Sequence, residues 1–179
     1  MSKQPLSDLY DIIRDVADFP EPGIVFKDVT PLLSNSSAFR AALDLMTETC
    51  RAMGPEKILA IESRGFIFGA PIAATLGVGL VLARKAGKLP WKRHRVEYAL
   101  EYGTDTIEIH QDSIHAGEKV VIVDDVLATG GTARAAGEVV DKAGGIVSGY
   151  GFLIELAFLG GRKKISQNGM AIESVLEYR

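Results

Sequence analysis

Four short apolar runs, separated by segments with helical spacing, constrain the fold of this chain more than any other feature. The runs begin near residues 58, 79, 120 and 147 and are almost uninterrupted by polar residues. Strands that are covered on both faces have this composition. Strands that alternate with helices form right-handed βαβ units, which build a parallel sheet. The sequence therefore predicts an α/β fold with a mainly parallel central sheet and helices on both faces.

Local patterns place the remaining elements around these four strands. Gly77 and Gly144–Gly145 are expected to end two helices, and Ser37 is expected to cap a third. Gly103–Asp105 is expected to be the turn of a hairpin. The predicted helices lie at 6–16, 37–53, 66–77, 131–145 and, as a short one, 160–165; a hairpin lies at 96–112, a final strand at 170–178, and loops at 18–31 and 86–95.

Length and composition predict a single domain in a reducing, cytoplasmic setting. The chain has 179 residues and a formal net charge of −3, so its surface as a whole does not favour nucleic acid. Its one cysteine, Cys50, cannot form a disulfide within the chain and is expected to be a small buried apolar residue. We also find no signal-peptide pattern and no apolar run that is long enough for a membrane span.

The segment VVIVDDVLATGGTA, residues 120–133, carries the strongest functional signal. Asp124 and Asp125 follow a buried strand, and ligands bind at the carboxyl ends of strands in open α/β sheets. The loop after them leads through Gly130 and Gly131 into a helix, and its backbone N–H groups can hold an anion. One end of the segment therefore suits hydroxyl groups or a metal-bound group, and the other end suits a phosphate.

Several well-known motifs with similar composition fit this segment poorly. The P-loop pattern and the dinucleotide-binding pattern are both absent, and a phosphorylatable aspartate would need acidic residues from other strand ends. A strand, a turn and a capped helix without any ligand is a further alternative. Two adjacent carboxylates and two adjacent glycines are poor choices for stability alone, which favours a ligand.

An apolar strand, Asp-Asp, three variable residues and Thr-Gly-Gly-Thr together resemble the phosphoribosyl-pyrophosphate signature of the type I phosphoribosyltransferase family. FPEPGIVFKDVTPLL, ESRGFIFGAPIA, RKAGKLP and LEYGTDTIEIH are similar, in order and spacing, to motifs of the family members that use adenine. The resemblance implies the reaction of adenine with 5-phosphoribosyl 1-pyrophosphate to give AMP and pyrophosphate, in purine salvage. It also implies Mg²⁺ as a cofactor, a homodimer, and a small hood to which residues 1–35 contribute.

The resemblance assigns roles to individual residues of this chain. Asp124 and Asp125 would hold the ribose hydroxyls, and Glu101 would act in proton transfer with the purine. A mobile lid at 89–102, which includes Tyr102, would close over the ligand. The 5-phosphate would contact Ala128, Thr129, Gly130, Gly131 and Thr132; pyrophosphate would contact Ser63, Arg64, Arg84, Lys85 and Lys88; adenine would contact Val25, Phe26, Lys27 and Leu156.

Two of these assignments carry specific expectations. Many relatives have arginine at the position of Lys27, so the resemblance supports base reading by the backbone here and leaves any side-chain role open. Arg84 is expected to reach the site of a neighbouring subunit. Trp91–Arg95 receives no role, and the three histidines, His94, His110 and His115, are expected to be exposed or structural.

Several alternatives remain at this point. The segment around Arg64 could be an ordinary helix start, Glu101 an exposed strand carboxylate, and the run 84–88 a solvated charged face. The base could be xanthine or hypoxanthine instead of adenine. A regulator of transcription or RNA that senses phosphoribosyl pyrophosphate could keep the Asp-Asp loop without catalysis, although the chain has no appended winged helix and no net basic charge.

Overall fold

A computed structural model describes residues 6–99, 103–166 and 170–179 of the chain. The structure divides into two compact units, Met1–Leu45 and Met46–Arg179. The sequence-based expectation of one domain over the whole chain stays a prediction.

The first unit contains a two-stranded antiparallel sheet that the sequence analysis missed. It consists of α1 (Leu6–Ile12), β1 (Arg14–Ala17), β2 (Val25–Asp28) and α2 (Thr30–Ser34), followed by the start of α3 (Ser36–Ala52). β1 pairs with β2 over four residues. The prediction of one helix over 6–16 is therefore wrong beyond Ile12, because ladder hydrogen bonds and two cross-strand ion pairs, Arg14–Asp28 and Lys27–Asp15, favour a strand.

The start of α3 is close to its predicted position, but its cap is a different residue. The side-chain oxygen of Asn35 accepts hydrogen bonds from the backbone N–H groups of Ser37 and Ala38, at 3.2 and 3.0 Å. Asn35 thus satisfies two amides that have no partner inside the helix. The helix begins at Ser36, one residue before the predicted cap, and ends at Ala52.

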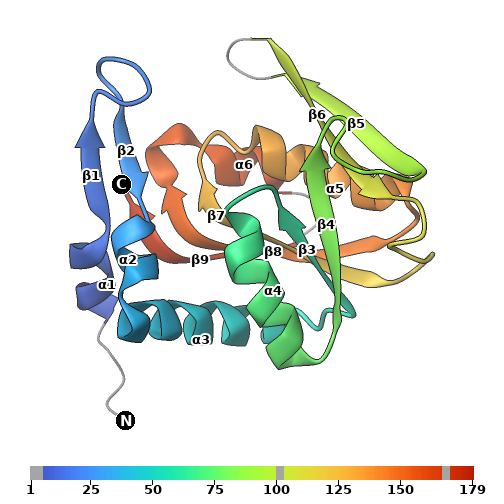
Figure 1. The fold of residues 1–179 in the computed structure, drawn as a ribbon, viewed down its shortest axis with the longest axis horizontal. Coiled ribbons are helices and arrows are strands. Elements are labelled where there is room, and N and C mark those ends of the chain that lie inside the picture. The colour runs from blue at the N-terminus through green and yellow to red at the C-terminus, as the bar shows by residue number, and fades with distance from the viewer. Residues whose placement is uncertain (1–5, 100–102, 167–169) are drawn as a thin grey trace. The chain divides into compact units, whose positions relative to one another are not determined.

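The second unit is built on one seven-stranded sheet (Figure 1). Its strand order is β5-β6-β4-β3-β7-β8-β9. The five strands from β4 to β9 in this order are parallel, and β6 and β5 add an antiparallel edge. The bounds are β3 (Lys57–Ile61), β4 (Gly79–Lys85), β5 (Arg93–Ala99), β6 (Thr104–His110), β7 (Lys119–Leu127), β8 (Ile146–Leu156) and β9 (Ala171–Tyr178). The predicted fold class is confirmed.

Helices α4 (Gly65–Leu76) and α5 (Gly131–Lys142) cover opposite faces of this sheet. Gly69 of α4 lies against Ala60 and Ile58 of β3. The alternate residues of β3, Leu59 and Ile61, join a buried cluster that contains the apolar residues of α5. Because side chains alternate across a strand, these two sets must point to opposite faces. A short 3₁₀ turn (Ala157–Leu159) and α6 (Gly161–Ile165) then lead from β8 to β9.

Cys50 is buried as predicted, and the structure explains why a small residue stands there. Its sulfur packs against Gly151 of β8, where an added Cβ would lie only 3.0 Å away. Burial raises the pKa of the Cys50 thiol to about 12. The residue is therefore an unreactive part of the core.

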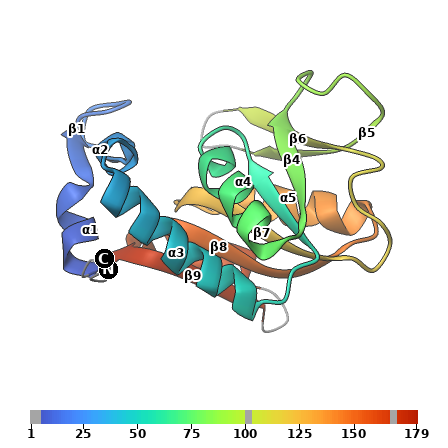
Figure 2. The ribbon, with the colours of Figure 1, turned by 60° about the horizontal axis from the view of Figure 1, so that its bottom comes forward.

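Two sequence-based expectations about β4 and β5 are wrong. β4 is covered on one face only, since Leu80 and Leu82 are 40% and 41% exposed. The basic loop after β4 ends at Lys92 instead of Arg95, because Arg93–Ala99 pairs with β6 in the hairpin beside β4 (Figure 2). His94 accordingly lies in a strand, half-buried, and not in a loop. Among the described residues, no helix is long and apolar enough to cross a membrane.

Candidate functional site

Polar residues of the second unit gather between β3 and β7, where the chain connections after these two strands run in opposite directions across the sheet. The chain leaves β3 toward β4 on one side, and leaves β7 toward β8 on the other side. The loops that follow β3 and β7 therefore flank a topological switch point, the usual ligand position in an open α/β sheet. Pairing between the two strands ends at Ala60↔Val123. Asp124 and Asp125 come next, inside β7, which continues along β8 to Leu127 instead of ending at the aspartates.

The two aspartates differ in their surroundings. Asp125 is buried, and its Oδ2 lies 2.5 Å from Nε of Arg64. This ion pair is not aligned as a hydrogen bond, so Oδ2 accepts none from the described residues. The backbone N–H of Asp125 donates to Oδ1 of Asp124 at 2.9 Å. Burial, and then the charge of Asp125, raise the pKa of Asp124 well above its usual range.

The raised pKa of Asp124 predicts a pH-dependent effect on stability. The folded protein holds this proton more tightly than the unfolded chain does. The ionisation of Asp124 therefore does not affect the free energy of unfolding below its unfolded pKa of about 4, and it lowers that free energy as pH rises through the folded pKa. Asp124→Asn should therefore raise the Tm of the ligand-free protein at pH 7–8 more than at pH 4–5. Thermal unfolding of both proteins from pH 4 to 8 measures this, and a pH-independent difference would contradict it.

The loop after β7 has the geometry of an anion cradle. Gly130 adopts a left-handed conformation with φ of 77° and caps α5, which begins at Gly131. The N–H groups of the first helical turn have no partners inside the helix, so they can face a ligand. The hydroxyl of Thr132 lies 3.3 Å from the hydroxyl of Tyr98 in β5. Ala128, Thr129 and Gly130 thus form the loop at the switch point, and Gly131 and Thr132 follow it as the first residues of α5.

The loop after β3 approaches β7 very closely through Gly65. Ser63 and Arg64 are exposed, and the Glu62–Ser63 peptide is cis. An added Cβ at Gly65 would lie 2.8 Å from the carbonyl oxygen of Val123 and 3.0 Å from Oδ1 of Asp124. Only glycine lets α4 begin this close to the aspartates. The structure therefore brings Ser63 and Arg64 beside Asp124 and Asp125, as predicted from the sequence.

Arg84 and Lys85, the last two residues of β4, are paired with carboxylates that the sequence analysis did not single out. Arg84 contacts Glu62 through Nε and Nη2, at 3.3 and 3.1 Å, and the N–H of Lys85 donates to the same carboxylate at 2.8 Å. The hydrogen bond from Arg84 keeps the pKa of Glu62 below its usual value. Lys85 forms an ion pair with Asp105 of β6. Lys88 is exposed, and its carbonyl accepts from Nη1 of Arg84 at 3.4 Å.

Tyr98 is a further residue that sequence reasoning missed. It is buried, and its hydroxyl lies within 3.3 Å of the side chains of Lys85, Asp105 and Thr132. Burial opposes the charged form of Lys85, but the bonds to Asp105 and Tyr98 outweigh it and raise the pKa of the lysine. Tyr98 and Asp105 are cross-strand neighbours in the hairpin. A correct hairpin register would have revealed this pair, but the predicted turn at 103–105 gives a different one.

The predicted adenine contacts lie in both units. Val25, Phe26 and Lys27 lie in β2 of the first unit. The ring of Phe26 packs edge-on against the ring of Phe19, with 5.2 Å between the ring centroids. Nζ of Lys27 lies 2.5 Å from Asp15, so its side chain is already engaged. Leu156 is the last residue of β8 in the second unit and is half-buried.

Two predicted residues lie outside the described part of the chain. Glu101 and Tyr102 fall between residues 99 and 103, where the structure gives no placement. Their assigned roles in proton transfer and in the lid remain predictions. The two histidines after the hairpin turn differ from each other: His115 is exposed, whereas Nε2 of His110 is buried and has no hydrogen-bond partner among the described residues.

Comparison with known proteins agrees with this arrangement. Residues 29–150 match the family model described as phosphoribosyl transferase domain. The chain is 52% identical over 171 residues to the adenine phosphoribosyltransferase of Cyanothece sp., covering 96% of this chain and 99% of the relative.

Solved structures give the same result. The crystal structure of adenine phosphoribosyltransferase from Thermoanaerobacter pseudethanolicus has a TM-score of 0.93 and 47% identity, over 97% of this chain and all of that one. The Saccharomyces cerevisiae enzyme, solved with an imino-altritol bisphosphate and adenine, has a TM-score of 0.88 and 39% identity, over 96% of this chain and 98% of that one. The chain belongs to the adenine phosphoribosyltransferase family.

Proposed function

We propose that the groups around the switch point transfer the phosphoribosyl group of 5-phosphoribosyl 1-pyrophosphate to adenine, which yields AMP and pyrophosphate for purine salvage. The observation that carries this proposal is the meeting of Asp124–Asp125, Gly130–Gly131 and Ser63–Arg64 at one edge of the sheet. These three groups offer hydrogen-bond acceptors, an anion cradle and a cation in one place. The adenine bound to the yeast relative supports the choice of base.

The sugar and its 5-phosphate fit the β7 side of the site. The amides of 128–132 would bind the phosphate, and Asp124 and Asp125 would accept hydrogen bonds from the ribose hydroxyls. As pyrophosphate leaves, the anomeric carbon develops positive charge, and the nearby carboxylates favour that charge.

The leaving pyrophosphate fits the β3 and β4 side. Arg64 would donate to it with a fork of N–H groups, beside the exposed Ser63. Arg84 pairs with Glu62 and Lys85 pairs with Asp105, so we infer that pyrophosphate would compete with these carboxylates for the two cations. Lys88 is exposed and would add a further positive charge.

Mg²⁺ is the cofactor that fits this chemistry. It prefers oxygen ligands and is commonly bound through substrate phosphates and water. Within 6–99, 103–166 and 170–179, no three His, Cys, Asp or Glu side chains gather as a metal site. The ion would be held mainly by pyrophosphate oxygens and water, and it would neutralise charge on the leaving group.

Adenine recognition is proposed for Val25–Lys27 and Leu156, with Glu101 for proton transfer and Tyr102 in the lid. Because Asp15 already binds the Lys27 side chain, backbone groups at this position are better placed to read a base than the ammonium group. Phe26 and Leu156 each offer an apolar surface that a base could contact. The position of its nucleophilic nitrogen in line with the leaving group would supply much of the rate.

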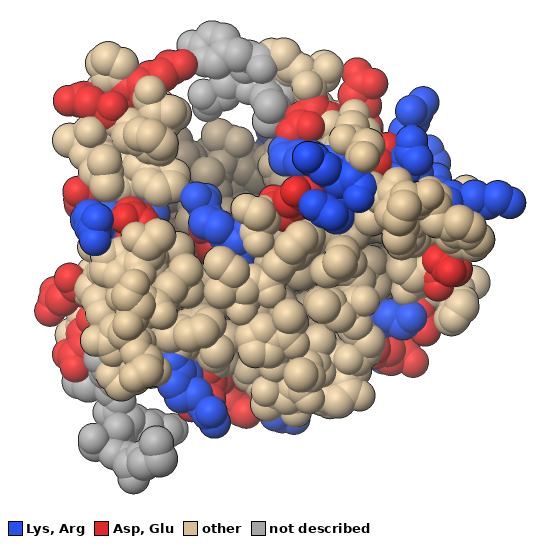
Figure 3. All heavy atoms as spheres, viewed as in Figure 1, with Lys and Arg blue, Asp and Glu red and all other residues tan. Residues whose placement is uncertain are grey.

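A homodimer is proposed from the uncovered face of β4. Leu80, Leu82 and Arg84 alternate along one face of the strand, and Ile67 of α4 is also exposed. In Figure 3 few charged side chains cover the surface over α4 and the adjacent part of β4. Such an apolar face suits a second copy of the chain. Arg84 would then lie at the interface, close to the partner.

Charged substitutions on this face test the dimer. Leu80→Glu with Leu82→Glu should raise the dimer dissociation constant by about 100-fold or more, because each interface would bury unpaired charges. Sedimentation velocity over a range of concentrations measures the constant. Ile146→Glu, at an apolar residue that is 51% exposed at the start of β8, is the control and should leave the dissociation constant unchanged. A variant that dimerises like the native chain would rule out this interface.

Two assays separate this function from its alternatives. Hypoxanthine or xanthine, added at about tenfold excess over adenine, should not inhibit AMP formation, because the proposed base site is selective for adenine. Strong competition would point to another base. A mobility-shift assay with DNA and RNA, with and without phosphoribosyl pyrophosphate, tests a regulatory role and should show no complex. The cytoplasmic location expected from the sequence remains a prediction.

A further inference from the structure

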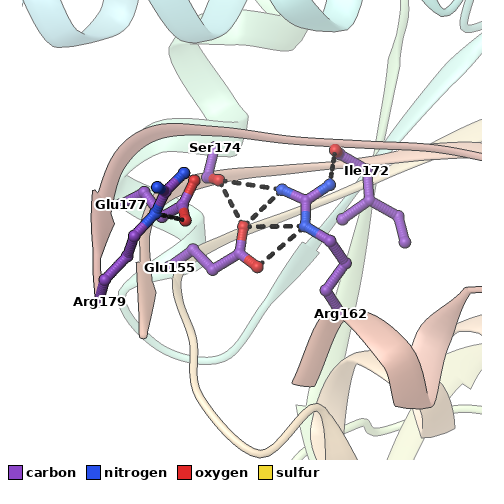
Figure 4. A network of polar contacts seen from close by, with 6 residues as sticks. All are labelled: Glu155, Arg162, Ile172, Ser174, Glu177 and Arg179. Carbon is purple, nitrogen blue, oxygen red and sulfur yellow. Dashed lines mark hydrogen bonds and ion pairs between the residues drawn. The ribbon is translucent and has the colours of Figure 1, made fainter. Parts of the chain in front are cut away.

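A network of polar contacts ties α6 to the last two strands (Figure 4). Glu155 of β8 is buried, yet it is charged in this network, since the hydrogen bonds from Arg162 lower its pKa. Nε of Arg162 donates to both carboxylate oxygens at 2.9 and 3.2 Å, and Nη2 donates to Oε2 at 2.5 Å. Nη1 donates to the carbonyl of Ile172, and Ser174 donates to Glu155 at 2.7 Å. The guanidinium group therefore joins α6 to both β8 and β9.

The other side of α6 touches the phosphate loop through backbone atoms. An added Cβ at Gly161 would collide with the carbonyl oxygen of Ala128 and lie 3.0 Å from the N atom of Gly130. In the reverse direction, an added Cβ at Gly130 would lie 2.7 Å from the carbonyl oxygen of Gly161. No side chain separates the two backbones at this contact. Any shift of Gly161 is therefore transmitted directly to the loop.

Helix α6 cannot hold this position by its own stability. It has five residues, which is far below the length at which an isolated helix forms. The Arg162 network ties it to the sheet, Ile165 is buried in the core cluster, and α6 also contacts α5. Arg162 follows Gly161 directly in the chain, so its side chain fixes the residue that supports the loop.

We propose that Glu155 and Arg162 are positioning residues. Through Gly161, they fix the position of the phosphate loop, residues 128–132, relative to the sheet. The proposal rests on the function proposed above, in which 128–132 binds the 5-phosphate. The bidentate contact holds α6 at a fixed distance from the sheet. The backbone of Gly161 then packs against Ala128 and Gly130. This contact keeps the N–H groups of the loop in the geometry that a phosphate requires.

Paired ligands test the proposal, because AMP carries the phosphate and adenosine does not. Arg162→Met should weaken AMP binding about 10- to 100-fold in calorimetry and leave adenosine binding within about threefold. In steady-state kinetics, KM for phosphoribosyl pyrophosphate should rise by a similar factor, with KM for adenine unchanged. Arg162→Lys keeps the charge but loses the fork of N–H donors. Its loss of AMP affinity should be smaller than that of Arg162→Met. Gly161→Ala keeps the ion network and should give the same selective loss.

The controls separate a positioning role from general damage. Arg179→Met removes an exposed arginine that pairs with Glu177 at 2.7 Å, and it should leave both affinities unchanged. Equal losses for AMP and adenosine, or no loss, in Arg162→Met and Gly161→Ala would overturn the proposal. If Arg162→Met does not fold, Arg162→Lys and Gly161→Ala decide by the same criterion. A native protein that binds AMP no better than adenosine would instead contradict the proposed function.

Discussion

Replacing Asp124 and Asp125 together by asparagine is expected to lower the turnover number for AMP formation by about 10³-fold or more, with the fold intact. Two neutral amides cannot favour the positive charge that develops on the sugar, and they donate hydrogen bonds where acceptors are required. Steady-state kinetics with adenine and phosphoribosyl pyrophosphate measure the loss. Circular dichroism and thermal unfolding should show a folded protein, because removing two crowded carboxylates relieves their repulsion.

An aspartate elsewhere in the same unit provides the matched control for this double variant. Asp112→Asn makes the same chemical change at an exposed position after β6 and should retain native kinetics. Near-normal turnover in the double variant would remove both aspartates from the mechanism. A loss in the Asp112 control as well would show that the effect is not local.

Glu101→Ala is expected to reduce the turnover number by about 10²-fold or more, with a smaller change in the KM for adenine. Proton transfer by a positioned carboxylate contributes a factor of this size, and it acts on the transition state more than on binding. Initial rates at saturating phosphoribosyl pyrophosphate and variable adenine separate the two constants. Glu48→Ala, at an exposed residue of α3, is the control and should behave like the native chain. An unchanged turnover number in Glu101→Ala would exclude the catalytic role.

The central fold could be predicted because its signals are local. Each buried parallel strand is an apolar run, and glycines such as Gly77 and Gly130 mark helix ends that adopt left-handed backbone. β4 was misjudged because its exposed Leu80 and Leu82 look the same in sequence as buried leucines. Composition records that a residue is apolar, and it does not record whether the same chain covers it.

The first unit was harder to predict, since its strands are stabilised by partners that are distant in sequence. Val16 and Ala17 fit the spacing of a helix that starts at Leu6, but pairing with Phe26 and Val25 places them in β1. A helical pattern of apolar residues is therefore weak evidence where a short antiparallel strand is also possible.

Sequence motifs predicted the ligand-binding residues of the candidate site. They did not predict the residues that pair with these groups or pack against them. Arg64 and the phosphate loop follow the ends of β3 and β7, and Asp124 comes directly after the last residue of β7 that pairs with β3. Topology alone brings these positions together. Glu62 and Asp105 lie inside recognised motifs, but nothing in the sequence indicates that they pair with Arg84 and Lys85. The contact of Gly161 with Gly130 and its loop joins two backbones that are distant in the chain, and no local signal encodes it.

One product assay tests the central claim most directly. The purified native chain, given adenine, phosphoribosyl pyrophosphate and Mg²⁺, should form AMP and pyrophosphate in equal amounts, and the double Asp124/Asp125 variant should form neither at a comparable rate. Chromatographic detection of AMP, with coupled detection of pyrophosphate, measures both products. Absence of AMP from the native chain, or AMP formation by the double variant at the native rate, would contradict the account.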